Sequence, residues 1–111
     1  MIIAVPMVQG SLSMHFGHCK SFRLFEVDEN KNIVKFEDKT PPPHEPGVFP
    51  KWLSEEKATV IITGGMGMHA QQLFAQYGIQ VVTGASANEP EAVVKSWLEG
   101  NFVAGANTCD H

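Results

Sequence analysis

Three short apolar runs along the chain predict buried strands. All three runs are of strand length. Residues 2–7 are almost entirely apolar, residues 58–63 have the apolar centre Val60-Ile61-Ile62, and residues 79–83 contain Ile79, Val81 and Val82. Runs of this kind are typical of strands that are covered on both faces in a parallel sheet. Residues 21–28 and 33–37 alternate more loosely around a polar turn, which predicts a β-hairpin.

Apolar residues at helical spacing predict helices between and after these strands. Pro50 suits the first turn of the first helix, and Gly78 and Gly100 follow the second and third as stop signals. The three apolar sets are Val48, Phe49, Trp52 and Leu53; Ala70, Leu73, Phe74 and Tyr77; and Val93, Val94, Trp97 and Leu98. The order strand, hairpin, then α-β-α-β-α predicts an α/β fold. We expect a mixed five-stranded sheet with about three helices, parallel right-handed crossovers and the hairpin at one edge.

Length and charge narrow the classes of function. The 111 residues suit a single domain, 1–111, whose tail, 101–111, has no periodicity and is expected to be flexible. The net charge of −4 and the absence of a basic stripe argue against nucleic acid as a partner. The apolar runs are far below the roughly 20 residues of a membrane-spanning helix. Because the N-terminus lacks the basic region of a signal peptide, we expect a cytoplasmic protein.

Candidate metal ligands are grouped in one predicted loop and in the tail. In open α/β sheets, sites form at the carboxyl ends of parallel strands, where residues 8–19, 64–69 and 84–89 would form loops. The first loop contains His15, His18 and Cys19, and the tail adds Cys109 and His111. Thiolate and imidazole suit zinc, Cu(I) and iron–sulfur species. Cysteines of this kind are also common as small buried apolar residues, and both interpretations stay open.

The second loop, Gly64-Gly65-Met66-Gly67, combines glycines with a following helix. Glycines let the backbone approach a bulky ligand, and amides at a helix N-terminus bind anions. Met14, Met66 and Met68 add soft sulfur near these loops, although methionine is more often core filler. Glycine is also common in any tight strand-to-helix turn, and His69 also fits a solvated helix position.

Three other classes of function remain to be weighed. His15, His18, Cys19 and Cys109 could complete a mononuclear zinc or Cu(I) site, because four such ligands fill a tetrahedral zinc site. A nuclease on such a sheet needs clustered carboxylates, and the three apolar runs contain none. A Cys–His hydrolase would need an orienting acid, which is not evident beside Cys19.

Three segments together resemble the dinitrogenase iron–molybdenum cofactor biosynthesis family. They are His15-Phe16-Gly17-His18-Cys19, the run Val60-Ile61-Ile62-Thr63 leading into the glycine loop, and Asn107-Thr108-Cys109-Asp110-His111. The resemblance covers essentially the whole chain and implies a ribonuclease-H-like fold of three layers. It implies a carrier or accessory protein rather than an enzyme. The cargo would be the iron–molybdenum cofactor, its iron–sulfur precursor or a molybdenum–copper sulfide cluster. It does not establish a role in nitrogen fixation.

The resemblance also assigns site residues. Cluster binding would fall on His15, His18, Cys19 and the loop Gly64, Gly65, Met66 and Gly67, with Cys109 and His111 as further ligands. His69 would help to hold an anionic cluster. Expected partners are the cluster and cofactor-assembly proteins, and the chain is expected to be a monomer or a weak homodimer. Separately from the resemblance, the lack of periodicity in the tail leads us to expect that it folds over the site only when a ligand is present.

Overall fold

The computed structural model describes residues 1–8, 11–12, 20–43, 47–85, 89–100 and 102. The described elements are the strands β1 (Ile2–Val8), β2 (Ser11–Leu12), β3 (Ser21–Val27), β4 (Ile33–Lys39), β5 (Ala58–Ile62) and β6 (Gln80–Val82), and the helices α1 (Val48–Glu55), α2 (Met68–Gln76) and α3 (Pro90–Leu98).

The sheet has the mixed architecture that the sequence predicts. Its strand order is β4-β3-β1-β5-β6, with β1, β5 and β6 parallel and with β3 and β4 as an antiparallel hairpin at one edge. The sequence did not predict β2, which pairs with the end of β1 over two residues. A strand of that length has no periodicity that a pattern can reveal.

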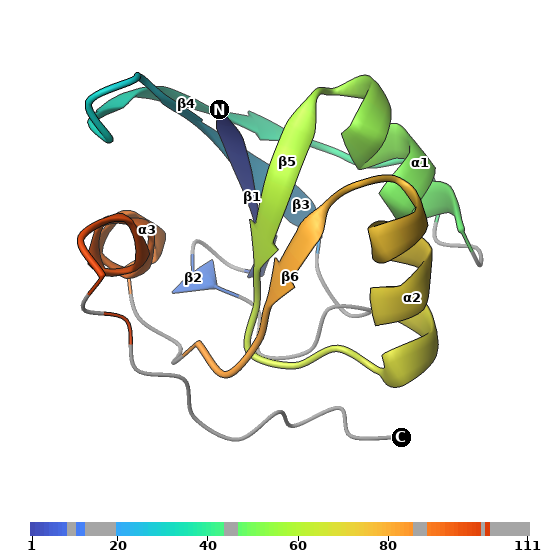
Figure 1. Ribbon diagram of the computed structural model, residues 1–111. Coiled ribbons are helices and arrows are strands. Elements are labelled where there is room, and N and C mark those ends of the chain that lie inside the picture. Colours follow the sequence, from blue (N-terminus) through green and yellow to red (C-terminus); the bar gives the residue numbers. More distant parts are fainter. Residues whose placement is uncertain (9–10, 13–19, 44–46, 86–88, 101, 103–111) are drawn as a thin grey trace.

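Helices cover both faces of the sheet, which gives three layers (Figure 1). α1 and α2 lie on one face and α3 lies on the other. Successive residues of β1 alternate between the two cores, as the pleat of a strand requires. Ile3 and Val5 pack in the cluster that contains Val94 of α3, whereas Ala4 packs in the cluster that contains Leu53 and Phe74 of α1 and α2. This arrangement is the ribonuclease-H-like α/β fold that the resemblance implied.

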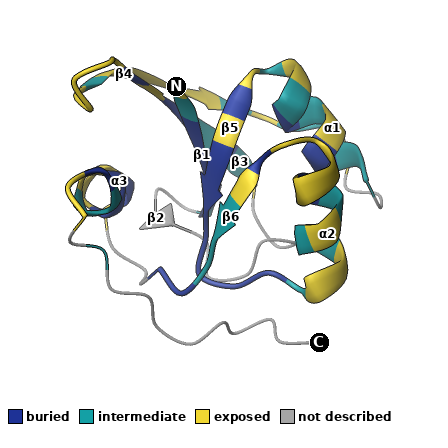
Figure 2. Cartoon of the chain, in the orientation of Figure 1, coloured by how far each residue is buried: buried dark blue, intermediate teal, exposed yellow. Residues whose placement is uncertain are grey.

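The hairpin strand β4 differs from the central strands in its exposure (Figure 2). Its five inner residues are all exposed, while the middle of β1 is wholly buried. The register of β4 against β3 shifts between Glu26 and Val27, which places a β-bulge near Val34. The prediction of a hairpin at the sheet edge is therefore confirmed.

Two boundaries differ from the predicted pattern. Tyr77, assigned to the core face of the second helix, instead follows α2 as its C-cap residue and is 43% exposed. Gly78 adopts a φ of 74°, which only glycine reaches without strain, so the helix ends before Tyr77 can turn toward the core. The third predicted strand is shorter than expected, at Gln80–Val82, and it is not buried: Gln80 is exposed and both valines are half-buried. The reason is its position, because β6 ends the described strand order and pairs only with β5. No helix among the described residues is long and apolar enough to cross a membrane.

Candidate functional site

The carboxyl ends of β1, β5 and β6 meet at one edge of the sheet (Figure 1). Parallel pairing places them there. Of the loops that leave this edge, residues 63–67 after β5 are described in full and residues 83–85 after β6 form the described start of a longer loop. The start of β3 returns to the same edge, where the amide of Lys20 donates to the carbonyl of Met7 at 2.8 Å. The predicted convergence of loops is therefore observed for the described segments.

Backbone hydrogen bonds join the loop after β5 to the loop after β6. The amide of Thr63 donates to Val82 O at 2.9 Å, that of Gly84 to Gly64 O at 3.0 Å, and that of Ala85 to Thr63 O at 3.2 Å. Gly84 reaches this geometry with a φ of 86°, a left-handed conformation that favours glycine. The parallel ladder therefore continues beyond the strands and fixes the two loops relative to each other.

The remaining carbonyls of the glycine loop accept hydrogen bonds from the chain itself. Gly65 O accepts from the hydroxyl of Thr63 at 3.4 Å. Met66 O accepts from the side-chain amide of Gln71 at 2.9 Å, and Gly67 O accepts from the backbone amide of Gln71 at 3.1 Å. Every carbonyl from residue 63 to residue 67 thus faces an internal donor.

This pattern fixes the direction of the amides. The described chain has no cis peptide bond, and in a trans peptide the C=O and the following N–H point to opposite sides. The N–H groups of residues 64–68 therefore point away from the donors that hold the carbonyls. Backbone N–H groups that reach a ligand in such a loop act as donors rather than acceptors, which suits an anion.

The start of α2 adds to the same electrostatic preference. Gly67 is the N-cap residue, with no side-chain capping bond, and no acidic side chain lies in the first turn. The first amides of a helix have no partner within the helix, and the helix dipole gives this end a partial positive charge. The loop and the helix start are therefore both suited to negative charge.

The side chains of this segment divide into buried and exposed ones. Gly64, Gly65 and Met66 are buried, and the Met66 side chain packs in the same core as Phe74. Its sulfur therefore belongs to the core, the alternative that the sequence had left open, and its contribution to a site would come from the backbone. Met68 and His69, in the first turn of α2, are exposed.

Some of the predicted site residues lie in the described part of the chain. The structure places Gly64, Gly65, Met66 and Gly67 in one loop and His69 on the adjoining helix turn. The predicted ligands His15, His18, Cys19, Cys109 and His111 lie outside the described residues, as does nearly all of the tail. Within the described part of the chain, no group of three or more His, Cys, Asp or Glu residues is arranged to hold a metal ion.

Three residues that support this segment were not singled out from the sequence. Thr63, Gln71 and Gly84 supply the hydrogen bonds that hold the glycine loop. Thr63 carries a weak signal, since it is a hydroxyl residue at the end of an apolar run and just before two glycines. Gln71 carries none, because its role depends on a carbonyl five residues earlier that only the folded turn brings within reach.

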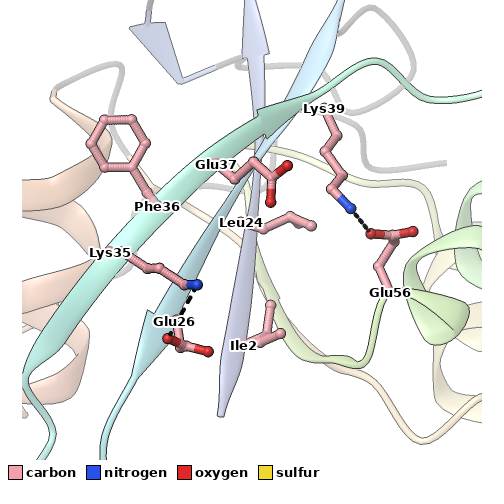
Figure 3. A pocket seen from close by; sticks show the side chains of 8 residues that line it. All are labelled: Ile2, Leu24, Glu26, Lys35, Phe36, Glu37, Lys39 and Glu56. Carbon is pink, nitrogen blue, oxygen red and sulfur yellow. Dashed lines mark hydrogen bonds and ion pairs between the residues drawn. The ribbon is translucent and has the colours of Figure 1, made fainter.

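A separate hollow lies beside β4 (Figure 3). Its volume is about 170 Å³, and it is lined by Ile2, Leu24, Glu26, Lys35, Phe36, Glu37, Lys39 and Glu56. Lys39 forms an ion pair with Glu56, which raises the pKa of Lys39. Lys35 and Glu26 form a looser pair at 4.0 Å. Because its lining carries both signs of charge, the hollow lacks the anion preference of the glycine loop.

Comparison with known proteins places the chain among small proteins of this fold. Residues 1–100 match the family described as "Dinitrogenase iron-molybdenum cofactor". The uncharacterised protein MJ0580 of Methanocaldococcus jannaschii is 28% identical over 106 residues, which cover 92% of this chain and 89% of that protein.

Two solved structures extend this likeness. The crystal structure of PH0822 is similar with a TM-score of 0.85 and 26% identity, over 94% of each chain. The apo form of the orange protein from Desulfovibrio gigas has a TM-score of 0.69 and 25% identity, over 96% of this chain and 93% of that one.

Proposed function

Because the chain belongs to the dinitrogenase iron–molybdenum cofactor family, we propose that it binds and carries a metal–sulfur cluster as an accessory protein of metallocofactor assembly. Its role would be carriage rather than catalysis. The cargo would be an iron–molybdenum, iron–sulfur or molybdenum–copper sulfide cluster. The family is associated with such clusters, and the related orange protein has been solved in a form named apo.

The observation that carries the proposal is the orientation of the glycine loop. Its carbonyls accept internal hydrogen bonds from residues such as Thr63 and Gln71, so the amides of residues 64–68 face the other way. Sulfide-rich clusters are usually anionic, and hydrogen bonds to their sulfur atoms tune them. Backbone amides and the start of α2 supply positive potential without a bulky side chain in the way.

We assign the direct metal ligands to the loop and tail residues His15, His18, Cys19, Cys109 and His111. Thiolate sulfur binds iron, copper and molybdenum–sulfur species, and imidazole supplements it. His69, exposed in the first turn of α2, would add a donor or a positive charge beside the amides. In this division the side chains bind metal and the loop backbone neutralises the charge of the sulfides.

The test is metal and acid-labile sulfide analysis of protein purified without oxygen and incubated with iron, copper or tetrathiomolybdate. We expect metal and sulfide in a fixed ratio, with visible absorption that Cys19→Ser abolishes. Zinc or copper without sulfide would instead identify a mononuclear site. Protein that takes up no metal under these conditions would refute carriage.

A matched pair of helix variants tests the anion-holding part of the proposal. His69 and Gln72 are both exposed on α2, but only His69 lies in its first turn. His69→Ala should weaken retention of a loaded cluster, measured by its rate of loss on a desalting column, while Gln72→Ala should not. Equal retention in both variants would remove His69 from the site and leave the loop amides as the remaining donors.

A further inference from the structure

The strand β4 lies at one end of the described sheet and pairs only with β3. Two of the exposed large apolar side chains are on it, Val34 at 58% and Phe36 at 50% exposure. The guanidinium of Arg23 lies 4.3 Å from the centre of the Phe36 ring. An exposed strand edge offers unpaired backbone donors and acceptors to another strand.

The hydrogen bonds of β3 determine which residues of β4 face outward. Met1 and Val27 exchange backbone hydrogen bonds in both directions, at 3.1 and 2.8 Å. The N–H and C=O groups of the odd-numbered residues of β3 therefore point toward β1. Because the direction of these backbone groups alternates along a strand, the N–H and C=O groups of Leu24 and Glu26 point toward β4. Their partners are Glu37 and Lys35. The N–H and C=O groups of Phe36 and Asp38 therefore point out from the edge.

We propose that β4 pairs antiparallel with β4 of a second copy of this chain, about a two-fold axis at Phe36. Phe36 then lies opposite its counterpart and exchanges both backbone bonds with it. On the face shown in Figure 3, each Lys35 lies opposite a Glu37 of the other copy. A two-fold interface uses the same surface patch on both copies, so this ion pair forms twice.

The charges along β4 favour a two-fold axis at Phe36 over an axis at a neighbouring residue. A shift of the axis to Glu37 would place like charges opposite each other, with Glu37 against Glu37 and Lys35 against Lys39. An axis at Lys35 would oppose two lysines. An axis at Asp38 would oppose two aspartates. Among the axes from Lys35 to Asp38, only the one at Phe36 places no like charges opposite each other, and like charges directly opposite each other destabilise a sheet.

The two side chains are available for this contact. Among the described residues Glu37 makes no ion pair, and Lys35 is 72% exposed in its 4.0 Å contact with Glu26. The edge of a seven-residue strand is small, below the roughly 1,200 Å² that separates transient from standard interfaces. The dimer should therefore be weak and dependent on concentration.

Charge reversal provides the test by sedimentation equilibrium of the full chain. Glu37→Lys and Lys35→Glu each place like charges opposite each other, so each variant should self-associate about tenfold more weakly than the wild type. An equimolar mixture, with one variant fluorescently labelled, should recover association because both pairs are again unlike. Glu99→Lys, an exposed change of the same charge at the end of α3, should associate as the wild type does.

Amide hydrogen exchange identifies the strand edge directly. The amides of Phe36 and Asp38 should exchange more slowly as the protein concentration rises, while those of Lys35 and Glu37, already bonded to β3, should not change. Circular dichroism and thermal melts establish that each variant is folded. The proposal is wrong if the wild type remains monomeric at the highest soluble concentration. It is also wrong if Glu37→Lys self-associates as strongly as the wild type.

Discussion

Replacing Gln71 by glutamate tests how the glycine loop is held. The side-chain amide of Gln71 donates to the Met66 carbonyl at 2.9 Å in a partly buried position. Gln71→Glu keeps the shape of the side chain but removes the donor and places a carboxylate against the carbonyl. Loss of such a bond costs about 0.5–1.5 kcal/mol, and a polar group left without a partner adds to this. We expect a loss of about 1–2 kcal/mol in the free energy of unfolding.

Gln72→Glu is the matched control for this variant. Gln72 is the next residue of α2 and is exposed, so its replacement has the same charge and nearly the same position in the helix dipole. Chemical denaturation at pH 7 should therefore show the loss only for Gln71→Glu. For a domain of this size the melting temperature should fall by roughly 4–8 °C.

The pH dependence provides a second, independent reading. The carboxyl introduced at position 71 gains a hydrogen-bond partner only when it is protonated, so its pKa in the folded state should rise above the usual value of about 4.3. Its destabilisation is then present at neutral pH and is relieved as the pH falls through that raised pKa. If both variants unfold alike at every pH, the Gln71 bond does not hold the loop.

Further substitutions address the core, the turn and the sheet edge. Met66→Leu should cost less than about 1.5 kcal/mol and leave cluster loading unchanged, because the thioether lies in the core; a loss of loading in a stable variant would identify the sulfur as a ligand. In urea denaturation, Gly84→Ala should lose about 1–2 kcal/mol more of the free energy of unfolding than Gly67→Ala, since φ is 86° at Gly84 but −66° at Gly67. Equal losses in the two variants would refute this reasoning. Hydrogen bonds from Arg23 hold the pKa of Asp38 below its usual range, so Asp38→Asn should cost under about 1 kcal/mol at pH 7. That difference should shrink as the pH falls below about 3.9, because the stabilisation of a carboxylate is lost on protonation; a constant gap would contradict it.

The sequence predicted the sheet well because its signals are strong and local. The apolar run 58–63 matches β5, and the alternation at 21–28 and 33–37 matches the edge hairpin. Burial on two faces needs apolar residues on both, and this pattern reports the environment of β1 and most of β5. It does not report that of β6, which is exposed to half-buried, or of β4, whose five inner residues are all exposed, because both strands lie at the ends of the sheet order. Figure 2 shows the same contrast in burial between β1 and β4.

The site was predictable only in outline. Strand order and loop position follow from connectivity, so the meeting of the loops at the carboxyl edge could be deduced. The hydrogen bonds that orient the loop could not, because the contact of Gln71 with Met66 depends on the geometry of one helix turn. Tyr77 illustrates the same limit, since its spacing fits the core face but the helix ends one residue too early.

The inward-facing carbonyls of residues 63–67 have a consequence for how such a fold diversifies. Backbone amides distinguish ligands by charge and size but do not distinguish which metal a ligand contains. In the proposed carrier, the identity of the metal would then be decided by the few side chains that bind it. Exchange of those few residues would redirect a protein of this type from one metal to another while the sheet and its turns stay as they are.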